Sequence, residues 1–63
     1  MTDLSSTQDS ILDAAERLFA RQGFTATTIK QIGNEAAVNP ALLYYYYDSK
    51  ETLYRAILQR ILE

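Results

Sequence analysis

The feature that most restricts the fold is a very short connection between two helical segments. Ile32 and Ala36 continue a helical spacing that begins at Ile29. Within a few residues, Asn39-Pro40 signals a new helix, because asparagine caps a helix and proline fits its first position. Two helices joined by so tight a turn must cross at a large angle. This arrangement is typical of a helix-turn-helix unit.

A longer helix is predicted before this unit. Ser6 and Asp9 fit a capping box, with Ser6 as the N-cap. Gly23 is suited to the left-handed stop of a Schellman motif, in which Phe24 packs back on the helix. Thr27 is then the predicted N-cap of the following helix. The apolar positions of the long helix follow one face: Ile11, Leu12, Ala15, Leu18 and Phe19.

A fourth helix is predicted from Asp48-Ser49-Lys50-Glu51, which repeats the capping-box pattern. It carries two apolar stripes about 100° apart. A three-helix core needs only one of them, so we expect the other to pack against a missing C-terminal domain or a second copy of the chain. The stripes contain Leu53, Ile57 and Ile61, and Tyr54, Leu58 and Leu62. The predicted fold class is therefore all-α, a three-helix helix-turn-helix (homeodomain-like) domain plus the start of a fourth helix.

Composition excludes several function classes. The 63 residues contain no cysteine, no histidine and only two glycines, which argues against disulfides, imidazole catalysis, common zinc sites and a glycine-rich phosphate loop. The longest apolar run, 41–47, is too short to span a bilayer, and the first residues lack the pattern of a secretion signal. We therefore expect a soluble cytoplasmic module with no cofactor, no metal, no membrane partner and no enzymatic activity.

The run Leu43-Tyr44-Tyr45-Tyr46-Tyr47 is the strongest pointer to function. Consecutive helical residues turn by about 100°, so four tyrosines in a row cannot all face the core. The helical wheel predicts Leu43 and Tyr47 as the core pair and places Tyr45 on the opposite side with Ala41 and Leu42. Tyr44 and Tyr46 flank the core stripe. The outward side of this helix is therefore aromatic or apolar and carries no charge.

Two interpretations of this surface compete. Phenol hydroxyls can donate to phosphates and aromatic rings can pack against sugars or thymine methyl groups, which favours DNA binding. Thr27 and Thr28 at one predicted helix start, and Lys50 at another, also suit phosphates. The net charge of −2 instead favours a protein-interaction module that uses the tyrosine-rich face.

Many positions in one order resemble the N-terminal DNA-binding domain of TetR-type (tetracycline-repressor-like) transcriptional regulators, from about 11 to 57. The resemblance implies a homodimeric bacterial repressor whose third helix enters the major groove of a palindromic operator. It also implies a C-terminal domain, absent from this chain, that dimerises and binds a small-molecule inducer. The matching positions are Ile11-Leu12, Ala14-Ala15, Leu18-Phe19, Gly23-Phe24, Thr27-Thr28, Ile32, Ala36-Ala37-Val38, Leu43-Tyr44, Tyr46-Tyr47, Ser49-Lys50-Glu51 and Leu53.

The resemblance also assigns residues and segments. Residues 1–6 are an N-terminal tail, 7–47 the DNA-binding domain with its helix-turn-helix at about 28–47, and 48–63 the fourth helix leading towards the C-terminal domain. One group matches positions that contact base edges, a second matches positions that contact phosphates, and Asn39 replaces a serine-like cap. The first group is Pro40, Ala41, Leu42 and Tyr44; the second is Thr27, Thr28, Tyr45, Tyr46 and Lys50.

Besides Asn39, the chain departs from the family pattern at four places. Gly33 and Ala37 stand where alanine and glycine, respectively, are usual, which predicts a slightly altered turn. Pro40 and Leu42 replace polar residues, so fewer hydrogen bonds to bases and more contacts with thymine methyl groups are expected.

Overall fold

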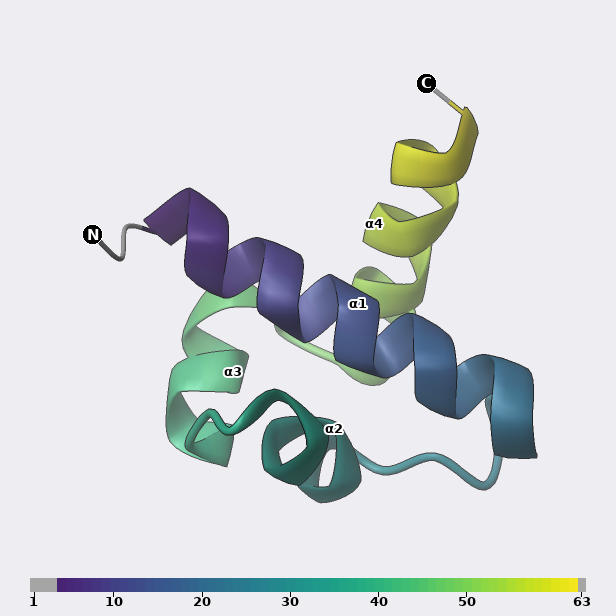
Figure 1. Cartoon of the computed structure of the whole chain (residues 1–63), viewed down its shortest axis with the longest axis horizontal. Helices are drawn as coiled ribbons and strands as arrows, with labels where there is room; N and C mark the ends of the chain where they lie inside the picture. Colours follow the sequence, from purple (N-terminus) through teal and green to yellow (C-terminus); the bar gives the residue numbers. More distant parts are fainter. Residues whose placement is uncertain (1–3, 63) are drawn as a thin grey trace.

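The computed structural model describes residues 4–62, which form four helices and no strand (Figure 1). These are α1 (Leu4–Gln22), α2 (Ile29–Ala36), α3 (Pro40–Tyr46) and α4 (Lys50–Leu62). In Figure 1, α1 crosses the molecule, α2 and α3 lie below it, and α4 rises in the opposite direction towards the C-terminus. None of the described helices is long and apolar enough to cross a bilayer. The predicted all-α class is confirmed.

The first helix begins earlier than predicted. Because α1 starts at Leu4, Ser6 lies inside the helix and is not its N-cap, and residues 4–6 of the predicted tail are helical. Residues 1–3 of that tail lie outside the described residues. The left-handed stop predicted at the end of α1 is confirmed, since Gly23 has a φ of 87°. The Gly23 N–H donates to the Phe19 carbonyl at 2.9 Å, which is the αL form of this motif, and the Phe19 and Phe24 rings pack with centroids 5.5 Å apart.

Helix α2 is capped one residue later than predicted. Thr28, not Thr27, is the N-cap: its hydroxyl accepts from the Gln31 N–H at 3.1 Å. The Gln31 side chain in turn accepts from the Thr28 N–H at 3.0 Å, which completes a capping box. The prediction was wrong because two adjacent threonines satisfy the same sequence pattern.

The turn between α2 and α3 combines a strained alanine with a close backbone approach. Ala37 has φ 59° and ψ 41°, a left-handed conformation that costs a non-glycine residue about 1 kcal/mol. A Cβ added to Gly33 would lie 2.7 Å from the Val38 carbonyl oxygen, so only glycine fits there without movement. The Val38 N–H donates to the Gly33 carbonyl at 2.8 Å and closes the turn. The turn therefore differs at both exchanged positions: alanine occupies the left-handed position at 37, and glycine occupies the close approach at 33.

The starts of the last two helices follow the predicted pattern with one shift. Asn39 Oδ1 accepts from the Ala41 N–H at 2.8 Å, and Pro40 occupies the first helical position, as predicted. At α4 the residue before the helix is Ser49, whose hydroxyl accepts from the Thr52 N–H at 3.2 Å. The cap is therefore Ser49, one residue after the Asp48 implied by the sequence pattern.

The core lies where α1 packs against α2 and α4, with α3 completing it through α2. Removing the buried apolar side chains of this core from water supplies the main driving force for folding of a domain of this size. The second predicted stripe of α4 stays largely outside the core, with exposed fractions of 39% for Tyr54 and 84% for Leu62. The buried apolar residues are Ile11, Leu12, Ala14, Ala15, Leu18, Ile32, Leu43, Tyr47, Leu53 and Ile57.

Candidate nucleic-acid interface

The outward side of α3 is an exposed surface of apolar and aromatic groups. The exposed fractions are 42% for Leu42, 53% for Tyr44 and 76% for Tyr45, and Ala41 is also exposed. Pro40 is half-buried at the start of the helix. We call Pro40, Ala41, Leu42, Tyr44 and Tyr45 the α3 face. The helical wheel placed Ala41, Leu42 and Tyr45 opposite the core and Tyr44 beside the core stripe, and all four side chains are exposed.

The inward side of α3 anchors this surface. Leu43 is fully buried and Tyr47 is 8% exposed, as the sequence predicted, although Tyr47 follows the last helical residue. Burial raises the pKa of the Tyr47 phenol, because the phenolate loses its hydration there. Tyr46 is half-buried and packs on the core, with its ring against Tyr45 and Tyr47. The orientation of the α3 face is therefore fixed by side chains of the same short segment.

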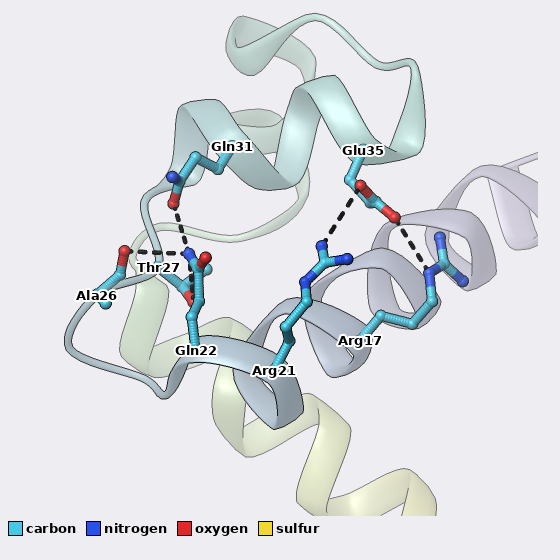
Figure 2. Close-up of polar contacts among 7 residues, drawn as sticks. All are labelled: Arg17, Arg21, Gln22, Ala26, Thr27, Gln31 and Glu35. Carbon is cyan, nitrogen blue, oxygen red and sulfur yellow. Dashed lines mark hydrogen bonds and ion pairs between the residues drawn. The ribbon is translucent and has the colours of Figure 1, made fainter.

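The start of α2 is held by two glutamines from different helices (Figure 2). Gln22 Nε2, at the end of α1, donates to Gln31 Oε1 at 2.9 Å and also contacts the Ala26 carbonyl at 3.2 Å. Gln31 Oε1 is the acceptor that completes the capping box of Thr28. The hydroxyl of Thr28 is consequently exposed but fixed in position at the first turn of α2.

Thr27 does not lie on this surface. Its side chain is 1% exposed, and its hydroxyl donates to the Gly23 carbonyl at 2.7 Å. Gln22 Nε2 lies 3.4 Å from the same hydroxyl (Figure 2). Thr27 therefore stabilises the loop between α1 and α2, and its predicted contact with a phosphate is inconsistent with this burial.

A second polar link ties α2 to α1 at the other end of α2. Glu35 accepts from Arg17 at 3.3 Å and lies 3.9 Å from Arg21 (Figure 2). All three side chains are substantially exposed, so the link contributes little to folding stability, about 1 kcal/mol at most. Its effect is geometric, since α2 is held along α1 at both of its ends.

Lys50 occupies a different environment from the one predicted for it. Its Nζ donates to the Phe24 carbonyl at 2.7 Å and lies 4.2 Å from the centroid of the Phe24 ring. The rings of Phe24, Phe19 and Tyr54 pack together next to this contact, with centroids 5.2–5.6 Å apart. Lys50 thus fastens the start of α4 to the loop that precedes α2. An ammonium group has three donors, so the other two remain for a further acceptor.

Acidic residues of α1 are directed towards α4. Arg60 of α4 lies 3.1 Å from Asp13 and 2.8 Å from Glu16. The C-terminal part of α4 and the α2–α3 pair lie on different sides of α1 (Figure 1). The carboxylates of Asp13 and Glu16 are therefore paired with α4 and not with α2 or α3.

A family model described as "Bacterial regulatory proteins, tetR family" matches residues 11–57. The chain belongs to the TetR family. It is accordingly a DNA-binding helix-turn-helix domain of a transcriptional regulator, and the family is not one of enzymes. This membership favours DNA over the protein-interaction module that was the alternative from sequence.

Individual relatives agree with the TetR assignment. The chain is 44% identical over 55 residues to the HTH-type transcriptional repressor NicS of Pseudomonas putida, covering 87% of this chain and 26% of NicS. It is 42% identical over 60 residues to the HTH-type transcriptional regulator RutR of Escherichia coli, covering 95% and 28%. A crystal structure of an HlyIIR mutant superimposes with a TM-score of 0.91 at 37% identity, covering 95% of this chain and 33% of that one. The chain thus spans about a quarter to a third of the length of these relatives.

Two residues of this TetR-family interface were missed by sequence reasoning. Gln31 carries a visible signal, because Thr28 and Gln31 have the threonine-to-glutamine spacing of a capping box. Choosing Thr27 as the cap concealed it. Gln22 gives no such signal, since its role depends on a contact between α1 and α2 that only the folded chain creates.

Proposed function

We propose that this chain binds a specific DNA operator by inserting α3 into the major groove. Four side chains of the α3 face contact base edges there, while the start of α2 contacts the phosphate backbone; the four are Pro40, Ala41, Leu42 and Tyr44. The observation that carries the proposal is the uncharged, exposed α3 face held rigidly by Leu43 and Tyr47 beneath it. An α-helix of this kind fits the width of the major groove.

Phosphate contacts are proposed at two helix starts. At α2, the capping box uses the N–H groups of Thr28 and Gln31, and leaves those of Ile29 and Lys30 for an anion. The fixed Thr28 hydroxyl lies beside them. Lys50 and the exposed Tyr45 phenol supply further donors, and Tyr46 contributes through its partly exposed ring. Phosphate contacts of this kind set the position of α3 without specifying sequence.

The whole regulator is proposed to act as a dimeric repressor in the cytoplasm. Matched TetR relatives are several times longer than this chain, so a further C-terminal domain is the natural place for dimerisation and for an inducer. One of these relatives is named a transcriptional repressor. Two copies would bind the half-sites of a palindromic operator one helical turn apart. Release by a small molecule would follow from inducer binding in that other domain.

The deciding experiment selects an operator for this chain from a random duplex pool and then titrates it at several salt concentrations. We expect one enriched half-site sequence and a shallow salt dependence. Each neutralised phosphate adds about 0.9 to the slope of log affinity against log salt concentration, and the α3 face has no cation of its own. A pool that stays random after selection would contradict the proposal.

Tyr44→Phe tests the assigned surface. Loss of one phenol hydroxyl should weaken operator binding about fivefold, the equivalent of one ordinary hydrogen bond of about 1 kcal/mol. Tyr54→Phe is the matched control, because Tyr54 is also exposed but lies on α4. Equal affinities of Tyr44→Phe and the parent chain would show that the Tyr44 hydroxyl is not a contact.

A further inference from the structure

The α3 face has almost no group with which to read a base pair by paired hydrogen bonds. Between Glu35 and Asp48 the sequence has no charged residue, so the arginine or lysine contact that identifies guanine is missing from this helix. The side chains of Pro40, Ala41 and Leu42 have no hydrogen-bonding atom. Tyr44 and Tyr45 each offer one hydroxyl, which makes single rather than paired contacts.

Asn39 is the remaining candidate for a paired hydrogen bond, and its geometry argues against that role. A bidentate contact with adenine requires both the oxygen and the nitrogen of the carboxamide. Asn39 Oδ1 already accepts from the Ala41 N–H at 2.8 Å as the N-cap of α3. Turning the carboxamide towards a base would remove this cap, at a cost of about 1 kcal/mol.

The same surface is well suited to methyl groups. Leu42 leaves 42% of its surface exposed and Ala41 is exposed next to it, so both lose hydration when they meet an apolar group. In the major groove the C5-methyl of thymine is the apolar group that distinguishes one base from the others, and alanine is among its usual partners. A methyl group seated against Ala41 and Leu42 would therefore be recognised by burial alone.

We infer that this domain identifies its operator mainly through the C5-methyl groups of pyrimidines opposite Ala41 and Leu42. The inference rests on the proposed function, and it adds the class of DNA that the site binds: duplexes that present thymine, or 5-methylcytosine, to the start of α3. Uracil forms the same base pair as thymine but lacks the methyl group, so it is the appropriate probe.

The test replaces the thymines of the selected operator by deoxyuridine, one position at a time, and measures affinity by fluorescence anisotropy. At least one replacement should weaken binding about fourfold, the value of one buried methyl group at about 0.8 kcal/mol, and 5-methylcytosine should bind better than cytosine wherever cytosine is tolerated. An enriched operator whose affinity changes less than twofold at every uracil would overturn this inference and leave the proposed function standing. A pool without an enriched sequence would overturn both.

Leu42→Ala identifies the side chain responsible. This variant should lose most of the preference for thymine over uracil at one position while keeping the rest of the operator preference. Leu58→Ala is the control, since Leu58 is also 42% exposed but lies on α4. If Leu42→Ala retained the full preference for thymine at every position, the inference would be wrong; thermal melting of both variants checks that each is folded.

Discussion

The molecule exposes apolar side chains in two regions, the α3 face and the outer stripe of α4, and exposure alone does not distinguish them. Leu42 on α3 and Leu58 on α4 are exposed to the same extent, 42% each. They differ in what supports them and in what surrounds them. The α3 face follows a tight turn, is anchored by Leu43 and Tyr47, and carries phenol hydroxyls.

The stripe of α4 has a different composition. Beyond Tyr54 it consists of aliphatic side chains, and it becomes more exposed towards the end of the helix, since Leu58 is 42% and Leu62 84% exposed. Aliphatic groups without donors suit another apolar surface better than a phosphate backbone. The comparison shows that the chemistry of a surface and its support, more than its exposure, indicate the kind of partner.

The largest expected difference between the two regions comes from adding a negative charge. Leu42→Asp should weaken operator binding on the order of 100-fold or more, because a carboxylate in the groove would be repelled by the phosphates and would lose its hydration. Leu58→Asp should leave affinity within about twofold. Anisotropy titration of the same operator with both variants makes the measurement. Similar losses in the two variants would remove the distinction drawn between the regions.

A smaller effect is expected from the turn that supports only the α3 face. Gly33→Ala places a Cβ 2.7 Å from the Val38 carbonyl oxygen and should lower the free energy of unfolding by about 1–3 kcal/mol. Ala37→Gly should raise it by about 0.5–1 kcal/mol, since glycine adopts the left-handed conformation without strain. Urea denaturation followed by circular dichroism measures both changes. A stabilising Gly33→Ala would mean that the turn is more adaptable than its geometry indicates.

The smallest effect concerns Tyr47 and appears only at alkaline pH. Its pKa is raised above the usual 10.0 by burial, so the folded chain holds the phenol proton more tightly than the unfolded chain does. This contribution is complete below pH 10 and is lost as pH rises through the folded-state pKa. Tyr47→Phe should therefore show a smaller loss of stability above pH 10 than the parent chain. Parallel denaturation curves at pH 8 and above pH 10 test this; equal losses would contradict it.

Local sequence patterns predicted most of the fold. Gly23, Asn39 and Pro40 act within a few residues of themselves, so their roles were visible before any tertiary contact was known. The division of α3 between Leu43 and the exposed Tyr45 followed from helical geometry alone. The choice between Thr27 and Thr28 did not, because it depends on which hydroxyl becomes buried against the end of α1.

The candidate site was less predictable where it depends on contacts between helices. Lys50 was expected to hold a phosphate at a helix start, and its ammonium group also donates to the Phe24 carbonyl, 26 residues away in sequence, a contact that the sequence did not indicate. Arg17 lies in contact with Glu35, 18 residues away in sequence, which the spacing of charges along the first helix alone does not indicate. Gln22 helps to hold the start of α2 only because its side chain donates to Gln31, a contact between two helices. Long polar side chains have several partners within reach, and packing decides among them.

The strained alanine of the α2–α3 turn has an evolutionary consequence. Every alanine codon becomes a glycine codon by a change of its middle base, so relief of the left-handed strain at Ala37 is a single nucleotide away. The substitution Ala37→Gly is therefore easily reached in evolution. The stability that it adds would allow the domain to tolerate destabilising substitutions that change its DNA preference.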